Sequence, residues 1–507
     1  MTRNLRPNLN RSDLSAGVLS GVLYVSAFPP FGFWIASLFF LVPVFARCRR
    51  HDNLRQSFWT GFFAGLVGWC GLIYWLCHAT GAGVSLLVLV LALYWGVFFA
   101  IASRFRATPF RWIFLPLVWV IFEAVRSVGY LAFAWGLVGQ ALGSFSLLLN
   151  TTSVTGVLPL SALAILVNLG ISEFLETAPA PLRKVFFLKS PASPPAHGSA
   201  ICFLAILTLG FVTVCGLTLT FSPDDTRKGQ PLRVAAIQGN YPLDEKLEED
   251  IDATLDRYLE LSRSAREEGA ELAVWPESAL TYPLRYWPGV VNRVQAFCDE
   301  TGMDLLVGSV DGNQIDLGEG REHWTLYNSA FLFRPGAMKE ADEYPCDLSP
   351  IQRYDKIRLV PWGEMVPLGK WWPFSLIESV IESAGGGIFE PGTEITIFEG
   401  PHGAKFGVSI CFESTLPGLA HQQRELGADF LVNITNDAWF KRSTAPYQHL
   451  QQCIFRAVEN RCWVVRAANT GFSAIVDPRG DVIARTDLFE RGYALADIYP
   501  DSGRKPQ

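Results

Sequence analysis

The chain has 507 residues, of which half are hydrophobic and only 18% are charged, and its formal net charge is −6. An ordinary soluble protein carries about 25% charged residues, and a nucleic-acid binder carries a basic face. The composition is thus less charged than that of an ordinary soluble protein, and the negative net charge argues against a nucleic-acid partner. The 36 Phe, 16 Trp and 14 Tyr residues supply enough apolar surface to exclude a disordered chain as well.

Charged residues are absent from four long windows in the first half of the chain, at 14–46, 57–103, 127–172 and 199–223. A helix needs about 20 apolar residues to cross a bilayer. The windows therefore predict an α-helical membrane bundle over residues 1–221. We expect about seven spans, at 14–28, 31–46, 57–77, 84–103, 111–126, 153–175 and 199–221. Residues 129–150 are apolar too, but their glycines favour an interfacial or re-entrant segment.

Basic residues indicate the orientation of this bundle. The N-terminus and the loops after the second, fourth and sixth spans carry thirteen Lys and Arg residues, whereas the alternate loops carry none. By the positive-inside rule, the N-terminus is cytoplasmic and the chain after the seventh span lies on the outer face. The spans are nearly free of ionisable residues. Glu123 and Arg126 lie near one boundary, and their i, i+3 spacing suggests a simple pair.

The second half of the chain has a soluble pattern. Residues 222–230 are expected to form a linker, 231–499 a second domain and 500–507 a polar tail. Short β-rich runs alternate there with amphipathic helical patterns, which predicts a layered α/β domain. Strands are expected at 232–237, 272–275, 304–308, 329–333, 406–410, 430–433, 462–467 and 473–476, and helices at 244–268, 288–300, 415–426 and 445–459.

Three reactive side chains stand where such domains carry chemistry. Glu277 and Cys411 each follow an apolar strand, and Lys356 lies in a polar loop that enters an apolar run. A thiol with a pKa near 8.5 is mostly protonated at neutral pH. A carboxylate can take its proton, and an ammonium can stabilise the oxyanion formed when sulfur attacks a carbonyl. The set therefore predicts acyl transfer through a thioester.

Each of these residues also has an ordinary structural explanation. A lone Cys after a strand is usually a core residue, a Glu there is commonly solvated or a helix cap, and a loop Lys is usually exposed. The sequence spacing leaves open whether the three meet. The seven histidines offer no recognisable Ser/His or Cys/His pair, and the ten cysteines make no CxxC pair or zinc spacing. We therefore expect no metal and no cofactor.

Longer strings around these residues resemble known enzymes. Residues 275–277, 356–367 and 407–413 resemble the nitrilase, or carbon–nitrogen hydrolase, superfamily. The closer resemblance is to the apolipoprotein N-acyltransferases, bacterial inner-membrane enzymes that add the third acyl chain to lipoproteins. Further strings that resemble this family lie at 28–33, 61–76, 436–440, 447–450, 456–460 and 466–471.

The resemblance implies a fold and a set of roles. The fold would be an αββα sandwich attached to a membrane bundle. By the matching motifs, Glu277 would be the general base, Lys356 the oxyanion stabiliser and Cys411 the nucleophile. Other matching positions imply supporting roles for Glu364 and Glu413, and loop-ordering or lipid-contacting roles for Asn436, Trp439 and Arg466. The aromatic segment 371–376 would be a lid or a lipid-contacting arm, with core packing as the alternative.

The implied reaction moves an acyl chain from a glycerophospholipid, expected to be phosphatidylethanolamine, to Cys411. The chain then passes to the α-amino group of the N-terminal diacylglyceryl-cysteine of an apolipoprotein. The enzyme would lie in the bacterial inner membrane with its catalytic domain on the periplasmic face. Two alternatives stay open: a membrane-tethered amidase or nitrilase that uses water as the acceptor, and a membrane scaffold or transporter without enzymatic activity. The nearly charge-free spans count against transport.

Overall fold

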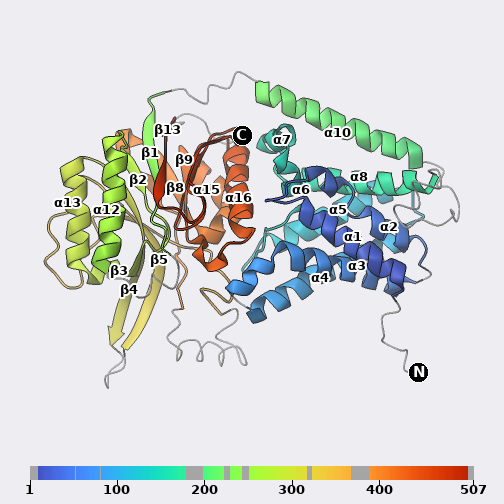
Figure 1. Cartoon of the computed structure of the whole chain (residues 1–507), viewed down its shortest axis with the longest axis horizontal. Helices are drawn as coiled ribbons and strands as arrows, with labels where there is room; N and C mark the ends of the chain where they lie inside the picture. Colours follow the sequence, from blue (N-terminus) through green and yellow to red (C-terminus); the bar gives the residue numbers. More distant parts are fainter. Residues whose placement is uncertain are drawn as a thin grey trace. The chain divides into compact units, whose positions relative to one another are not determined.

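Helices make up the first half of the chain, and two β-sheets form the centre of the second. The computed structural model describes residues 9–51, 53–79, 81–177, 198–221, 229–241, 251–316, 322–366 and 388–500. The chain divides into a helical unit, Met1–Ser222, and a sheet unit, Pro223–Gln507 (Figure 1). Most of the predicted linker, nearly all of the predicted tail and the whole segment 371–376 lie outside the described residues.

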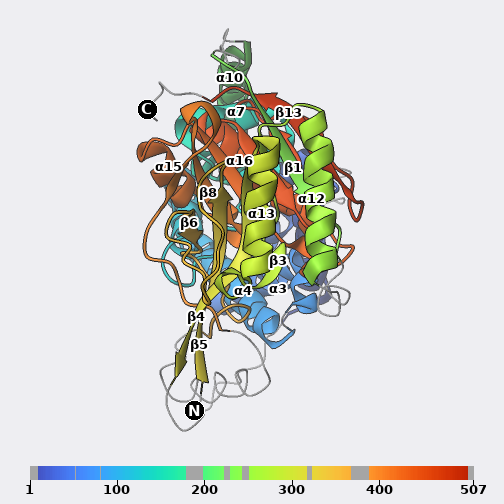
Figure 2. The ribbon, with the colours of Figure 1, turned by 90° about the vertical axis from the view of Figure 1, so that its left-hand side faces the viewer.

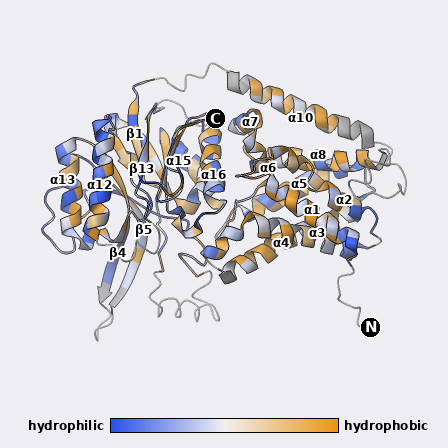
Figure 3. Ribbon diagram, viewed as in Figure 1, coloured by the Kyte–Doolittle hydropathy of each residue, from blue (hydrophilic) through white to orange (hydrophobic). Residues whose placement is uncertain are grey.

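The helical unit contains long, mainly hydrophobic helices (Figure 3). Two of them, over Gly83–Arg104 and Leu158–Leu175, are long and apolar enough to cross a membrane. The stretches Trp34–Cys48 and Leu204–Thr218 are apolar but shorter. The count of seven spans therefore remains a prediction. The helices are α1 (Arg11–Ser26), α2 (Val42–Cys48), α3 (Leu54–Leu72), α4 (Gly81–Arg104), α5 (Arg111–Arg126), α6 (Val138–Ala141), α7 (Ser146–Thr155), α8 (Leu158–Thr177) and α10 (Gly198–Phe221).

Three of the predicted spans are not single helices. The span at 57–77 is divided at Ile73, between α3 and a 3₁₀ helix over Tyr74–His78. The span at 31–46 was expected to be continuous, but a 3₁₀ helix over Trp34–Leu38 is followed by a break before α2. Asn168 of α8 satisfies the backbone at this break, because its side chain accepts from the Leu41 N–H at 2.8 Å and donates to the Ser37 carbonyl at 2.8 Å. The span at 153–175 is interrupted at Gly156, whose φ of 68° ends α7 before α8 begins.

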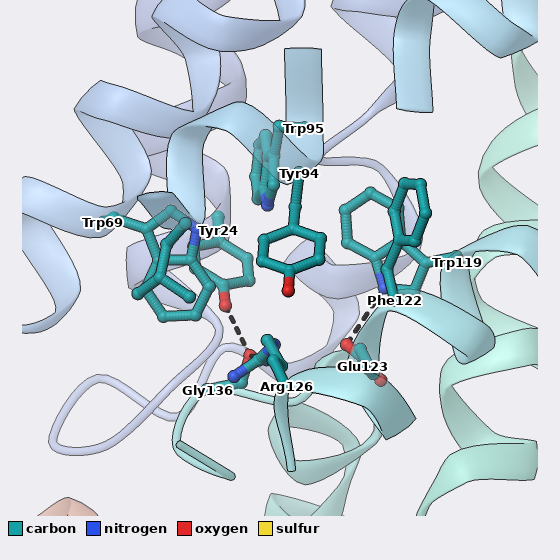
Figure 4. Close-up of a pocket in the computed structure, with 10 residues that line it drawn as sticks. Tyr24, Trp69, Tyr94, Trp95, Trp119, Phe122, Glu123, Arg126 and Gly136 are labelled. Carbon is teal, nitrogen blue, oxygen red and sulfur yellow. Dashed lines mark hydrogen bonds between the residues drawn. The ribbon is translucent and has the colours of Figure 1, made fainter. Parts of the chain in front are cut away.

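The predicted pairing of Glu123 with Arg126 is wrong: among the ion pairs of the described residues, none joins them. Glu123 Oε1 accepts from the Trp119 indole at 2.9 Å and from the Val138 N–H at 2.8 Å. Arg126 donates to the carbonyls of Phe133 (2.7 Å), Trp135 (2.7 Å) and Gly136 (3.0 Å). Both side chains thus fasten the segment after α5, beside a small aromatic cavity (Figure 4).

The sheet unit contains two sheets. The first has the strand order β13-β1-β2-β4-β5-β6, with β3 paired to β4, and the second has the order β12-β11-β10-β9-β8-β7. The strands of the first sheet are β1 (Leu232–Gln238), β2 (Leu272–Val274), β3 (Leu280–Pro283), β4 (Asp304–Asp316), β5 (Glu322–Phe333), β6 (Gln352–Asp355) and β13 (Gly492–Ile498). Those of the second are β7 (Ile397–Glu399), β8 (Lys405–Ile410), β9 (Phe430–Thr435), β10 (Val464–Ala468), β11 (Ala474–Val476) and β12 (Val482–Arg485).

Three apolar clusters show how these sheets and helices are layered. Val234 and Leu306 of the first sheet share one buried cluster with Val408 and Val432 of the second, so the sheets pack face to face. A second cluster joins the other face of the first sheet to α12 (Ile251–Glu267) and α13 (Pro288–Thr301), which lie side by side (Figure 2). A third joins the second sheet to α15 (Pro417–Glu425) and α16 (Ala445–Asn460). The result is a helix–sheet–sheet–helix sandwich.

Parallel strands at the centre of each sheet determine where functional side chains gather. β1, β2 and β4 are parallel in one sheet, and β8, β9 and β10 are parallel in the other. Polar residues that follow the carboxyl ends of such strands meet at one edge. The eight predicted strands and four predicted helices of this unit are present, although residues 244–250 of the first predicted helix lie outside the described residues. The strands β3, β6, β7, β12 and β13 were not predicted, and β4 and β5 are longer than expected.

Candidate active site

Lys356 lies directly after β6 and is buried between two glutamates. Its Nζ atom is 3.2 Å from Oε1 of Glu277 and 2.8 Å from Oε1 of Glu364. Burial alone would lower the pKa of Lys356, but the charges of Glu277 and Glu364 outweigh it and raise the pKa above its usual range. Lys356 is therefore an ammonium at neutral pH. The Glu364 carboxylate also accepts from the Val360 N–H at 2.8 Å, which closes the loop around the lysine.

Glu277 follows β2 and lies in a turn that the Ala279 N–H closes on the Pro276 carbonyl oxygen at 3.2 Å. Its Oε1 accepts from the Asn328 side chain at 2.8 Å, and its Oε2 accepts from the backbone N–H of Asn436 at 2.8 Å. Burial alone would raise the pKa of Glu277, but the charge of Lys356 and these hydrogen bonds lower it. The turn needs a glycine beneath it, because a β-carbon at Gly308 of β4 would lie 2.1 Å from the Pro276 carbonyl oxygen.

Cys411 is the residue directly after β8 and the first of the 3₁₀ helix Cys411–Thr415. Its backbone has φ of +54°, in the left-handed region that non-glycine residues rarely adopt. Burial and the charge of Glu277 raise the pKa of the thiol well above its usual range, and the charge of Lys356 opposes this rise. The thiol is therefore protonated at neutral pH, close enough to both groups to be influenced by their charges.

Glu413 joins the loop that carries Lys356 to the turn that carries Cys411. Its Oε1 accepts from the backbone N–H groups of Ile357 (2.8 Å) and Arg358 (2.9 Å), and its Oε2 accepts from that of Ile410 (2.8 Å). The Tyr354 hydroxyl donates to the same carboxyl at 2.9 Å. Burial raises the pKa of Glu413 to about 7 although these donors lower it. One buried carboxyl thus holds the loop after β6 of the first sheet against the end of β8 of the second.

Replacing Glu413 by glutamine is expected to destabilise the protein. Every neighbour of this carboxyl donates, so an amide NH2 group in place of one oxygen would face a donor. An unsatisfied buried group costs about 1–3 kcal/mol of unfolding free energy. The check is the melting temperature of the purified full-length protein, with Glu425→Gln on the exposed side of α15 as the control. Equal melting temperatures of the two variants would contradict the joining role.

The three remaining predicted residues lie around this centre. Asn436 orders the loop after β9, since its Oδ1 accepts from Asn469 at 3.0 Å while its N–H binds Glu277. Trp439 lies in the 3₁₀ turn Asp437–Phe440 with 47% of its surface exposed. Arg466 of β10 is fully buried, and its guanidinium is 2.7 Å from the Asp437 carboxylate. Of the two roles expected for Arg466, loop ordering and lipid contact, its complete burial favours loop ordering.

Sequence reasoning missed that His449 contacts a serine and an aspartate near Cys411. The expectation of no Ser/His pairing is wrong, because His449 Nε2 lies 3.1 Å from the Ser414 hydroxyl and 3.1 Å from the Cys411 carbonyl oxygen. His449 Nδ1 lies 2.9 Å from Asp437 Oδ1. Asn328, which donates to both Glu277 and Glu364, was missed as well. The family-like strings at 436–440 and 447–450 contain Asp437 and His449 and were the available signal.

The described residues contain no group of three or more His, Cys, Asp or Glu side chains arranged to hold a metal ion. The stacked sheets, with a Glu, a Lys and a Cys at their strand ends, define a carbon–nitrogen hydrolase domain, and the family model described as carbon-nitrogen hydrolase matches residues 233–505. The model of the apolipoprotein N-acyltransferase N-terminal domain matches residues 20–170. The chain belongs to the apolipoprotein N-acyltransferase family.

Two relatives support this assignment over nearly the whole chain. The apolipoprotein N-acyltransferase of Geobacter metallireducens is 34% identical over 96% of this chain and 89% of its own length. Apolipoprotein N-acyltransferase 1 of Treponema denticola is 26% identical over 96% of this chain and 90% of its own length. Among solved structures, Saccharomyces cerevisiae Nit3, a nitrilase superfamily member, is 20% identical, covers 54% of this chain and 92% of its own, and has a TM-score of 0.38.

Proposed function

We propose that this chain is a phospholipid:apolipoprotein N-acyltransferase that works through a thioester on Cys411. The observation that carries the proposal is the combination of an ionised carboxylate, Glu277, and an ammonium, Lys356, whose charges both act on one buried thiol. This is the set of groups that a thiol needs for attack on an ester carbonyl. Relatives named apolipoprotein N-acyltransferase supply the acceptor class.

In the first half-reaction, Glu277 takes the proton of the Cys411 thiol while sulfur attacks the ester carbonyl carbon of a glycerophospholipid. The oxyanion that forms is stabilised by the Lys356 ammonium. The bond between the carbonyl carbon and the glycerol oxygen then breaks, and protonated Glu277 returns its proton to that oxygen. The products are a lysophospholipid and the thioester, and phosphatidylethanolamine is the donor we propose.

In the second half-reaction, the neutral α-amino group of a diacylglyceryl-cysteine attacks the thioester carbonyl. A carbon–nitrogen bond forms, the carbon–sulfur bond breaks, and Glu277 carries the proton of the amine to the leaving sulfur. Glu364 has a specific use in both halves. When Glu277 is protonated, Lys356 still has the Glu364 carboxylate 2.8 Å away, so the ammonium stays paired and in place.

The proposal includes a position in the membrane. We propose that the helical unit spans the bacterial inner membrane seven times, with a cytoplasmic N-terminus and the sheet unit on the periplasmic face. Two helices of sufficient length and the one-sided placement of thirteen basic residues support this arrangement. A nucleophile on that face would be close to the acyl esters of the outer leaflet, where the donor is present.

The test is the intact mass of the full-length protein after incubation with phosphatidylethanolamine vesicles, compared with Cys411→Ala. We expect a mass increase of one acyl group that neutral hydroxylamine removes and that the variant lacks. An adduct on Cys411→Ala, or none on a folded native protein, would overturn the thioester. Release of ammonia from small amides, without acyl transfer to an amine, would instead favour the membrane-tethered amidase.

A further inference from the structure

A continuous chain of buried polar contacts lies behind the Cys411 backbone. Arg466 is 2.7 Å from Oδ2 of Asp437, whose Oδ1 is 2.9 Å from Nδ1 of His449. The other ring nitrogen, Nε2, is 3.1 Å from the Cys411 carbonyl oxygen. Arg466, Asp437 and His449 are each at most 1% exposed. The chain therefore joins β10, the loop after β9 and α16 to the one backbone carbonyl that belongs to the proposed nucleophile.

The end point of this chain is a strained residue. Cys411 has φ of +54°, and a residue with a β-carbon keeps such a conformation only when its surroundings impose it. Its carbonyl oxygen has three polar neighbours: His449 Nε2, the Ser414 hydroxyl at 3.0 Å and the Asn433 side-chain amide at 3.5 Å. These contacts oppose rotation of the peptide that follows Cys411. Two of the three members are themselves fixed by charged groups, His449 by Asp437 and Asn433 by Arg466.

The neighbouring backbone is shaped to admit the carboxylate of Asp437. A β-carbon at Gly471 would lie 2.2 Å from Oδ2 of Asp437, so this position accepts only glycine while the carboxylate keeps its place. Arg466 is further held by the Asn433 side chain at 2.5 Å and by the Phe472 carbonyl at 3.2 Å. Burying charged groups in this way adds little net stability compared with apolar packing, which favours an orienting role for the arrangement.

We infer that Asp437, His449 and Arg466 are positioning residues for acyl transfer, because together they hold the Cys411 carbonyl and thereby keep the thiol in the left-handed turn. The inference rests on the proposed role of Cys411 as nucleophile. Arg466 fixes the Asp437 carboxylate. His449 holds both neighbours as an imidazolium, donating from Nδ1 to the carboxylate and from Nε2 to the carbonyl. Burial and the charge of Arg466 lower the pKa of His449, whereas Asp437 and the Cys411 carbonyl favour the protonated ring. Ser414, which completes a Ser–His–Asp arrangement, is 3% exposed and is directed at the same carbonyl, so it supports the turn.

Three substitutions of His449 separate this role from simple packing. Glutamine can place its amide near the position of Nε2 and still donate to the Cys411 carbonyl, whereas asparagine reaches only Asp437, and leucine reaches neither. We expect the kcat of thioester formation to fall about 100-fold in His449→Leu and His449→Asn, with the KM for phosphatidylethanolamine unchanged. His449→Gln is expected to stay within about tenfold of the native rate.

The controls distinguish the inference from the proposed function. Val291→Ala, at a buried core position of α13, supplies a variant that is destabilised without touching this chain of contacts. If His449→Asn is as active as His449→Gln or more active, the ring serves only Asp437, and the inference fails. It also fails if His449→Leu keeps native kcat. If Cys411→Ala retains the adduct, the proposed function fails instead. Should the leucine variant not fold, the comparison of glutamine with asparagine decides.

Discussion

Lys356→Met is expected to slow thioester formation by about 1,000-fold. A single preorganised donor to an oxyanion contributes about 100- to 1,000-fold to the rate, and Lys356 is a charged donor held by Glu277 and Glu364 in a buried site. Methionine keeps the length and the apolar stem of lysine but removes the ammonium. The check is the single-turnover rate of acyl-adduct formation, measured by intact mass. Lys405→Met, at the exposed start of β8, is the control.

The same substitution is expected to change the pH dependence. In the native protein, the charge of Lys356 is the largest influence that lowers the pKa of Glu277 against burial. Without the ammonium, burial raises this pKa, and a larger share of Glu277 is protonated at neutral pH and cannot accept the thiol proton. The residual rate of Lys356→Met should therefore rise with pH through the neutral range more steeply than the native rate. Parallel profiles would contradict the coupling of the two groups.

Parts of the sheet unit could be predicted from the sequence because its buried strands appear there as short runs of apolar residues. The strands that precede Glu277 and Cys411 are short apolar runs, and each run ends where a charged or reactive residue follows. Asn328 could not be found in this way. It lies inside β5, and it contacts Glu277 and Glu364 only because β5 pairs with β4 and β6 in one particular register.

The histidine contact was hidden for a different reason. Asp437 and His449 lie 26 and 38 positions after Cys411 in the chain, and the carbonyl that His449 contacts belongs to a residue with a positive φ. A positive φ can be anticipated at glycine, but a cysteine gives no such signal. The family-like strings marked both residues as notable, yet periodicity and spacing could not assign them a partner.

The helical unit shows a similar limit. Charge-free runs locate apolar segments, but they do not reveal where a helix breaks, because a break is satisfied by partners far away in the sequence. Asn168 provides the missing hydrogen bonds at Ser37 and Leu41 from more than 120 residues further along. Likewise, Glu123 and Arg126 have the spacing of a pair but find backbone partners in the segment that follows α5.

Glu277→Gln is expected to reduce the rate of acyl transfer by about 1,000-fold, which lies within the contribution that a general base usually makes to the rate. Oε2 of Glu277 accepts from the Asn436 N–H, and Oε1 accepts from Asn328 and Lys356. A glutamine must turn its NH2 group toward one of these donors, so it loses the base and also repels a neighbour. Glu277→Asp, which keeps the charge on a shorter side chain, is the matched control and should retain more of the rate.

The choice of donor separates loss of proton transfer from displacement of Cys411. A glycerol alkoxide must be protonated as it leaves, whereas a nitrophenolate leaves without a proton. We therefore expect the deficit of Glu277→Gln to be smaller with a nitrophenyl ester of a fatty acid than with phosphatidylethanolamine. The residual rate should also rise with pH, because removing the Glu277 charge takes away one of the influences that raise the thiol pKa. An equal deficit with both donors would mean that Glu277 acts by holding the site together and does not carry the proton.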